Sequence, residues 1–465
     1  MYCEEEEKKR EKEEEKEIYM STFAIKNAIV VTCNENDEVI RDGAIIVDDN
    51  KITAVGRTKD LEEKIRECDE IIDGRDKIIT PGLISVHDHV IGHVFKGFTE
   101  DGAEDYFYKH CFSMETFLNP ENSYWFAYAG LMETLKFGCT MINDLFHYSQ
   151  STAEAVEDIG MKAIIQHKVF DIDLNNLQHK NYERFYDAGI KRLEENEELI
   201  KKWHNKADGR IKCWVGNHAP DTNSPELLKA GRELADKYGV GIHIHVAQTV
   251  QEHEMINNTY GMSSVKFLDS LGFLKDDVIC AHLAFADTED IAILERTGAK
   301  FAHCPVIMAK FGTFPRIKEF LTSKVPMAIG DDWVTLNPWG DMRAAIEVTR
   351  AVTGEALQYA IRAFRMMTID AANLLNLGDE TGSLEVGKKA DLIVIDALRP
   401  NLVPMKDVIP SLVYNMTGNE VETVYVDGKK IVDEGRILAK DEIEVMRKTQ
   451  SLAEEVWTKG GVWPE

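Results

Sequence analysis

The chain has 465 residues, of which 44% are hydrophobic, so we expect a buried core and a large domain accompanied by a smaller one. Its formal net charge of −27 at pH 7 disfavours nucleic acid and anionic membranes as partners, and no apolar stretch approaches the ~20 residues of a membrane span. The eight cysteines form no CxxC motif and the charged N-terminus has no secretory-signal pattern, so we expect a reduced protein of the cytoplasm.

Both ends of the chain differ in pattern from its middle. Residues 1–19 are almost entirely charged, which predicts a solvated helix or a disordered tail. Residues 20–80 and 383–435 alternate apolar and polar side chains around turn signals, as half-exposed antiparallel strands do. We therefore expect one small β-sandwich domain built from both segments, followed by a helical segment at residues 436–465.

The middle of the chain, residues 81–382, alternates short apolar runs with longer amphipathic stretches. One stretch, residues 225–238, has Ser224 as a helix N-cap and Gly239 at its end. Strands are predicted at Ile84–Val86, Met141–Asp144, Ala163–His167, Lys212–Gly216, Gly241–Val246, Val278–Cys280, Lys300–Ala302 and Met327–Ile329. Eight strands alternating with helices predict an α/β fold, the (β/α)8 TIM barrel.

Histidines and one aspartate stand at the ends of several of these strands. His87 and His89 are two residues apart, so strand alternation points them the same way. His245, His282 and Asp332 end three further apolar runs. The carboxyl ends of barrel strands form the active-site face. Imidazole and carboxylate ligands in this number predict one divalent metal ion, Zn²⁺ or Fe²⁺.

Three further residues are candidates for contact with a substrate. His218 follows a strand-like run and could reach the site, although a histidine that only shapes its loop is as good an interpretation. Trp333 could form an aromatic wall for a flat molecule or simply pack in its loop. His93 lies in the loop that follows the first barrel strand.

Seven motifs occur in an order that resembles the amidohydrolase superfamily, in its branch of chlorohydrolases and cyclic-amidine deaminases. The motifs are PGLISVHDHV, NHAPDTNSPELL, HIHVAQT, AHLA, HCP, GDD and LEVGKKADLIVID. The resemblance covers nearly the whole chain from Met20. It implies the barrel fold, a small-molecule heterocyclic substrate and a homo-oligomer, a dimer or larger.

The resemblance also implies roles for the strand-end residues. His87, His89, His245 and Asp332 would hold the metal ion, and His282 would help to hold the attacking water or the substrate. Within the pairs His243/His245 and Asp331/Asp332, the family motifs favour His245 and Asp332. A metal-bound hydroxide would then attack a ring carbon of a nitrogen heterocycle and release ammonia, an amine or a halide.

Gln248 departs from the family pattern at a catalytic position. Deaminases of this branch carry a glutamate there that shuttles a proton, and an amide cannot do this near neutral pH. Protonation would have to come from Asp332, His282, His93 or the substrate, or the leaving group would need no proton, as chloride does. The alternative hypothesis is a non-catalytic barrel that keeps its metal and binds a ligand.

Overall fold

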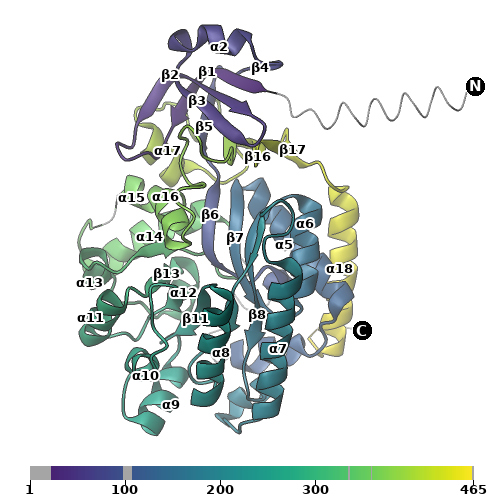
Figure 1. Cartoon of the computed structure of the whole chain (residues 1–465), viewed down its shortest axis with the longest axis vertical. Helices are drawn as coiled ribbons and strands as arrows, with labels where there is room; N and C mark the ends of the chain where they lie inside the picture. Colours follow the sequence, from purple (N-terminus) through teal and green to yellow (C-terminus); the bar gives the residue numbers. More distant parts are fainter. Residues whose placement is uncertain (1–21, 98–106, 334–335, 358, 463–465) are drawn as a thin grey trace, which may run out of the picture.

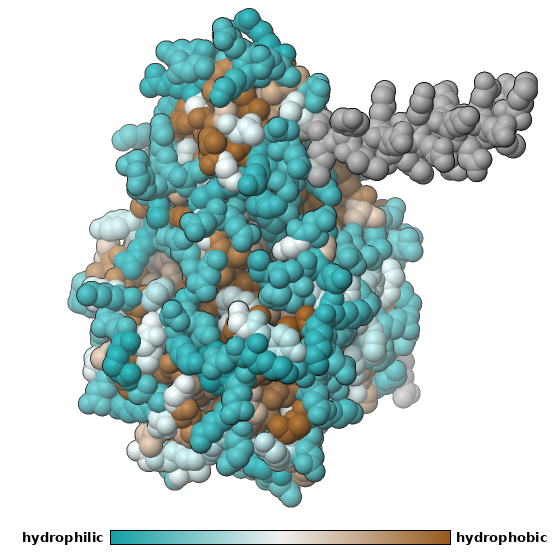
Figure 2. Space-filling view, viewed as in Figure 1, coloured by the Kyte–Doolittle hydropathy of each residue, from teal (hydrophilic) through white to brown (hydrophobic). Residues whose placement is uncertain are grey.

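The computed structural model describes residues 22–97, 107–333, 336–357 and 359–462. The predicted charged tail, residues 1–19, lies outside the described residues. Figure 1 shows a barrel wrapped by helices, with a separate sheet at one end. Within the described ranges, no helix is long and apolar enough to cross a membrane. The face drawn in Figure 2 is mainly hydrophilic, with smaller apolar patches between.

The barrel consists of parallel strands in the order β14-β13-β12-β11-β10-β8-β7-β6. Backbone hydrogen bonds of 2.9 Å from Asp332 to His87 and from His89 to Asp332 close the ring. The predicted TIM barrel is confirmed, and the predicted fourth strand is split into β9 and β10. The strands are β6 (Leu83–Asp88), β7 (Cys139–Phe146), β8 (Lys162–Val169), β9 (Ile211–Cys213), β10 (Val215–Asn217), β11 (Ile242–Val246), β12 (Val278–His282), β13 (Lys300–His303) and β14 (Met327–Ile329).

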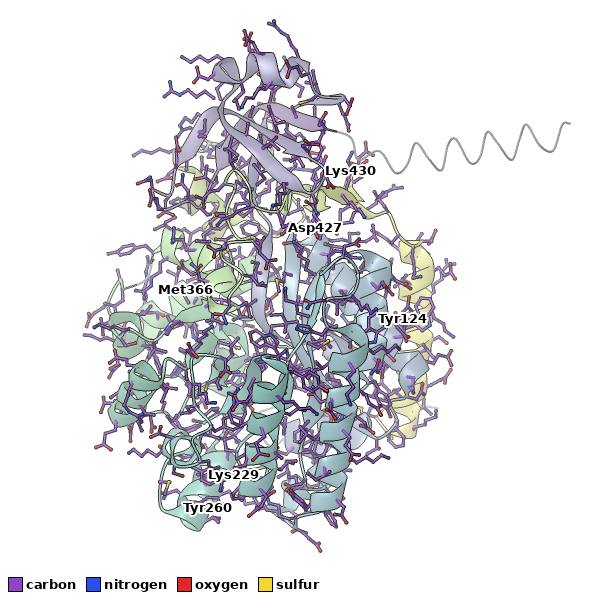
Figure 3. The ribbon with its side chains drawn as sticks, in the orientation of Figure 1. Tyr124, Lys229, Tyr260, Met366, Asp427 and Lys430 are labelled. Atoms are coloured by element: carbon purple, nitrogen blue, oxygen red, sulfur yellow. The ribbon has the colours of Figure 1, made fainter. Side chains whose placement is uncertain are left out.

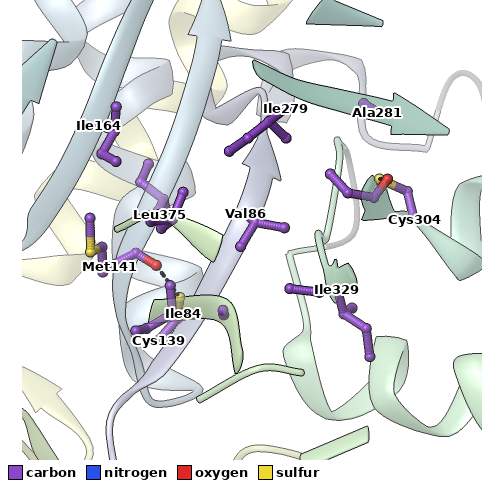
Figure 4. Close-up of a cluster of buried hydrophobic side chains, with 14 of the residues drawn as sticks. Ile84, Val86, Cys139, Met141, Ile164, Ile279, Ala281, Cys304, Ile329 and Leu375 are labelled. Atoms are coloured by element: carbon purple, nitrogen blue, oxygen red, sulfur yellow. Dashed lines mark hydrogen bonds between the residues drawn. The ribbon is translucent and has the colours of Figure 1, made fainter. Parts of the chain in front are cut away.

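Buried apolar side chains fill the barrel below the strand ends. Figure 4 shows Ile84 and Val86 of β6 meeting Met141, Ile164 and Ile279 from other strands. All five are almost inaccessible to solvent. Burial on both faces explains why these strands are continuous apolar runs in the sequence.

The helices between the strands begin and end where local chemistry predicts. The Ser224 hydroxyl accepts a hydrogen bond from the Leu227 amide at 3.3 Å, and Gly239 ends that helix at φ +64°. The longer helices are α5 (Pro120–Lys136), α6 (Ser149–Ile159), α7 (Tyr186–Trp203), α8 (Pro225–Tyr238), α9 (Val250–Tyr260), α11 (Thr288–Thr297), α14 (Pro338–Thr353) and α18 (Glu442–Lys459). Shorter ones include α10 (Ser264–Ser270), α12 (Pro305–Phe311), α13 (Ile317–Thr322), α15 (Ala360–Arg365), α16 (Ile369–Leu374) and α17 (Val408–Asn415).

The second sheet joins the two ends of the chain. Strand β5 pairs antiparallel with β15, with Pro81 opposite Leu392. The predicted small sheet domain built from both chain ends is confirmed, and its hydrogen bonds run through nine strands. The path folds over on itself, because Phe23 in β1 and Tyr425 in β16 stack with ring centroids 4.9 Å apart although β5 and β15 lie between these strands. Its strands are β1 (Phe23–Val31), β2 (Val39–Asp48), β3 (Lys51–Arg57), β4 (Glu70–Asp73), β5 (Lys77–Pro81), β15 (Leu392–Asp396), β16 (Val421–Val426), β17 (Lys429–Asp433) and β18 (Arg436–Ile437).

Buried ion pairs connect this sheet to the closed end of the barrel. The ammonium of Lys162, at the start of β8, lies 2.6 Å from Asp391 Oδ2 and 2.6 Å from Asp427 Oδ1. Figure 3 shows Asp427 at the junction of the two units. After the sheet, α18 runs along α5, where Lys136 contacts Glu442 at 2.7 Å.

Candidate metal centre

Four histidines and one aspartate converge at the open end of the barrel. Potential ligand atoms of His87, His89 and His245 all lie within 4.8 Å of one another, as do those of His87, His282 and Asp332. His89 Nε2 is 3.2 Å from His245 Nε2. Asp332 Oδ2 is 3.8 Å from His87 Nε2 and 3.7 Å from His282 Nε2. The five residues predicted from strand ends therefore surround one point.

Unusual backbone conformations accompany this convergence. His282 and Asp332 have φ angles of +78° and +69°, in the left-handed region that non-glycine residues rarely adopt. These conformations interrupt the regular strand alternation at the ends of two strands. Asp332 joins the cluster as a result, whereas the amide of Asp331 is bound to the Ser85 hydroxyl at 2.9 Å.

Backbone carbonyls orient two of the imidazoles. His89 Nδ1 lies 2.6 Å from the carbonyl oxygen of Leu145, and His245 Nδ1 lies 2.7 Å from that of His218. A carbonyl can only accept, so each Nδ1 carries the hydrogen and donates. The lone pair of each ring is then on Nε2, the atom that faces the centre of the cluster.

A chain of polar side chains inside the barrel orients His87. Gln166 Nε2 donates to Asn143 Oδ1 at 2.7 Å, which leaves Gln166 Oε1 to accept from His243 Nδ1 at 2.9 Å. His243 Nε2 then accepts from His87 Nδ1 at 2.7 Å. Of the two histidines in β11, His245 lies in the cluster and His243 supports His87.

The centre of the cluster suits a divalent cation. His87 Nε2, His282 Nε2 and Asp332 Oδ2 are buried and have no hydrogen-bond partner among the described residues. Burial holds the pKa values of His87, His89 and His282 well below the usual range, so the rings are neutral and can act as ligands. Unpartnered buried polar atoms are costly, and one bound ion would satisfy all three.

A small chamber of about 30 Å³ opens beside this cluster. Its lining includes Gln248, His218 and Trp333, which the sequence singled out. Among the described residues, the lining consists of His89, Glu115, Phe146, Lys168, His218, His245, Gln248, Phe311, Asp332 and Trp333.

The predicted substrate contact through His93 stays a prediction. His93 is not among the residues lining the chamber. It lies in the 3₁₀ turn Val90–Phe95, and its Nδ1 is 3.3 Å from Glu133 Oε2 on α5. The same carboxylate also pairs with Lys96.

Glu252 does not replace the missing carboxylate at position 248. Its Oε1 accepts from the Ala247 amide at 2.7 Å and its Oε2 from the Gln248 amide at 2.8 Å. The Ser264 hydroxyl also donates to it at 2.6 Å. Glu252 therefore shapes the loop that carries Gln248, with its oxygens committed to these donors.

Sequence reasoning missed an ion pair in the chamber wall. Lys168 Nζ lies 3.0 and 3.1 Å from the two carboxylate oxygens of Glu115, and His147 Nε2 lies 2.7 Å from Glu115 Oε2. Lys168 could have been found by alternation along β8, because it follows Gln166 by two residues. Glu115 ends the short helix Phe112–Glu115 before α5 and gives no such signal.

A second, larger cavity of about 700 Å³ adjoins the chamber. Glu115 lines both spaces. Phe112, His147, Phe170 and Arg192 are among its other lining residues. Glu115 and its ion pair therefore stand between the histidine cluster and the larger cavity.

Comparison with known proteins identifies the family. Residues 78–431 match the amidohydrolase family. The chain belongs to the amidohydrolase family. It is 33% identical over 444 residues to a 5'-deoxyadenosine deaminase of Methanosarcina acetivorans, covering 94% of this chain and 99% of the relative. It is also 33% identical to a 5-methylthioadenosine/S-adenosylhomocysteine deaminase of Moorella thermoacetica, covering 92% and 97%.

Solved structures share the fold at lower identity. An adenosine deaminase from Xanthomonas campestris with bound zinc superimposes with a TM-score of 0.86 at 23% identity, covering 94% of this chain and 98% of that one. An atrazine chlorohydrolase from Arthrobacter aurescens, complexed with zinc, gives 0.83 at 23% identity, covering 93% and 100%. The protein is thus an enzyme of this family, and the hypothesis of a non-catalytic barrel is not favoured.

Proposed function

We propose that this amidohydrolase binds one divalent transition-metal ion and hydrolyses a substituted nitrogen heterocycle at a ring carbon. The convergence of His87, His89, His245 and Asp332 on one point carries the proposal. Neutral imidazoles and one carboxylate suit Zn²⁺ and Fe²⁺. When bound, such an ion supplies a water acidified toward a pKa of ~7.

The protein's own residues would divide the remaining work. Asp332 Oδ2 has no hydrogen-bond partner among the described residues, so it can take the proton of the attacking water. His282 Nε2, 3.7 Å from that carboxylate, can hold the water or the substrate beside it. His243 and the carbonyl groups keep the ligand rings oriented.

The shape of the site supports a ring that carries a bulky substituent. The chamber at the cluster has aromatic walls in Phe146 and Trp333, which suit a flat ring. The substituent would extend past Glu115 into the larger cavity. The deaminase relatives, whose names specify adenosine derivatives, point to aminated purine nucleosides as the first class to test.

The leaving group depends on Gln248. This side chain lines the chamber but cannot relay a proton near neutral pH. Ammonia or an amine needs a proton to depart, which Asp332 or His282 would supply, whereas a halide does not. We keep all three leaving groups within the proposal.

A substrate screen with metal control tests the proposal. The Zn²⁺-loaded and Fe²⁺-loaded proteins would be incubated with purine nucleosides, pterins, pyrimidines and chlorotriazines, and ammonia and halide release followed. We expect turnover that is lost on chelation and restored by the metal. Full metal occupancy without turnover on any of these classes would contradict the proposed reaction.

Two further expectations belong to this proposal. We propose a homo-oligomer, a dimer or larger, as the resemblance to the family implied, and light scattering of the purified protein tests it. We also propose that the enzyme works in the cytoplasm. The cysteines of the described residues form no disulfide with one another, as a reducing compartment permits.

A further inference from the structure

Lys168 is a buried cation inside the chamber where the proposed substrate would react. Only 4% of its surface is exposed, and it lines the same cavity as Gln248, His245 and Asp332. Its position two residues after Gln166 on β8 directs it toward the inside of the barrel. Burying an ammonium is expensive, so its presence here calls for an explanation.

Its pairing with Glu115 leaves donor capacity unused. An ammonium has three N–H donors, and the recorded acceptors of Lys168 among the described residues are the two oxygens of Glu115. Its other close neighbours are aromatic: the rings of Phe112 and Phe146 lie with their centroids 4.9 and 5.3 Å from Nζ. Because Lys168 also lines the chamber, it can offer a donor to a molecule there.

Glu115 is itself held on two sides. His147 donates to it at 2.7 Å, and both Lys168 and His147 favour its ionised form. The pKa of Glu115 is lowered because these partners outweigh its burial. Burial lowers the pKa of Lys168, and the carboxylate of Glu115 opposes that shift while it holds the amine in the chamber wall.

We propose that Lys168 is a catalytic residue that stabilises the negative charge developing on the heterocycle. This inference rests on the proposed function. When hydroxide adds to the ring carbon, a C–O bond forms and the C=N electron pair moves onto the ring nitrogen. Lys168 donates a hydrogen bond to that nitrogen. The electron pair returns to the ring when the leaving group departs with its bonding electrons. The proton that Asp332 took from the attacking water passes to the leaving group, so water plus substrate give the hydroxylated ring plus the protonated leaving group.

The proposal explains how the site can operate with an amide at position 248. A carboxylic acid there would donate a proton to the ring nitrogen, which Gln248 cannot do. A fixed ammonium in a nearly closed chamber stabilises the same charge electrostatically. Because Lys168 is only 4% exposed, its charge acts more strongly than it would in solution.

Azide binding tests the proposal without turnover. The Co²⁺-loaded parent, Lys168→Met and Glu115→Gln proteins would be titrated with azide, and the visible absorption of Co²⁺ followed. Both substitutions break the same ion pair, but only Lys168→Met removes the cation. We expect azide affinity to fall at least fivefold in Lys168→Met and to fall less in Glu115→Gln, which keeps the amine but removes the carboxylate that favours its charged form, while Lys180→Met, at an exposed lysine, matches the parent. Equal weakening in both chamber variants, or none, would overturn the proposal.

If Lys168→Met does not fold, a double variant that also carries Glu115→Gln takes its place. Lys168→Met with Glu115→Gln leaves no unpaired buried charge, and we expect its azide affinity to fall below that of the parent; parent-like affinity would overturn the proposal.

Turnover supplies the second readout. On the parent's best substrate, we expect Lys168→Met to lower kcat about 10²-fold with metal content unchanged, the size typical of losing one such donor. An unchanged kcat would refute the catalytic role of Lys168 without contradicting the proposed hydrolysis. The parent could also turn over no substrate while azide affinity falls more in Lys168→Met than in Glu115→Gln. That result would contradict the proposed reaction but support anion binding by Lys168.

Discussion

His87 Nδ1 and His243 Nε2 lie 2.7 Å apart inside the barrel. Because His243 Nδ1 is bound to Gln166 Oε1, its Nε2 must accept the hydrogen of His87. The lone pair of His87 is thereby fixed on Nε2, facing Asp332 and His282. A residue that touches no ligand atom thus controls which nitrogen of His87 can bind a metal.

Substitutions at His243 test this control. His243→Phe removes the acceptor, and we expect metal affinity to fall 10- to 100-fold, as for other residues that orient metal ligands. His243→Gln keeps a hydrogen-bond acceptor near the same place, so its metal affinity should fall less. The measurement is the metal dissociation constant in competition with a chelator. Equal losses in the two variants would show that His243 only fills space.

Metal content tests the cluster itself. The His87→Ala, His89→Ala double variant should lose most of its bound metal, since it removes two of the convergent rings. His179→Ala, at an exposed histidine, is the matched control and should keep the parent's content. Elemental analysis of the proteins decides. Full metal in the double variant would refute the ligand assignment.

Much of this arrangement can be read from the sequence, because it depends on local patterns. Apolar runs alternating with helices predict the barrel, and His87 and His245 stand where such runs end. The pairing of Lys168 with Glu115 cannot be read in this way. It joins residues 53 positions apart, and one of them ends a four-residue helix. The continuous sheet depends likewise on the pairing of β5 with β15, which no local pattern encodes.

Acid should weaken the contribution of His147 to stability. Burial, partly offset by Glu115, lowers the pKa of His147 from 6.5 to about 4. The unfolded chain then binds more protons between these values, so the stability due to neutral His147 is present above pH 6.5 and lost as the pH falls. We expect the melting temperature advantage of the parent over His147→Gln to shrink between pH 7.5 and pH 5. An advantage that grows toward acid would contradict this.

The junction of sheet and barrel should depend on Lys162. Its ammonium is the shared partner of Asp391 and Asp427, both buried. Lys162→Met removes the ammonium that both carboxylates share. Removing one partner of a buried ion pair typically lowers the free energy of unfolding by about 3–5 kcal/mol. We expect a clear fall in melting temperature, with Lys180→Met unchanged. A Lys162→Met protein as stable as the parent would show that the junction is held by apolar contacts alone.

Gln248 separates this chain most clearly from the family pattern, and Gln248→Glu tests what its amide does. The new carboxylate would share a chamber of about 30 Å³ with Lys168 and Asp332. An additional negative charge opposes the approach of hydroxide and competes with substrate for Lys168, a cost felt strongly in a dry site. We therefore expect kcat on the parent's best substrate to stay level or fall.

Activity of Gln248→Glu on a cyclic amidine that expels ammonia could rise, because a carboxylate can relay protons. Steady-state kinetics on both substrates, at equal metal content, separate the two effects. A Gln248→Glu protein much faster than the parent on the parent's own substrate would mean that the amide marks an impaired site, with Lys168 unable to take over the task of an acid.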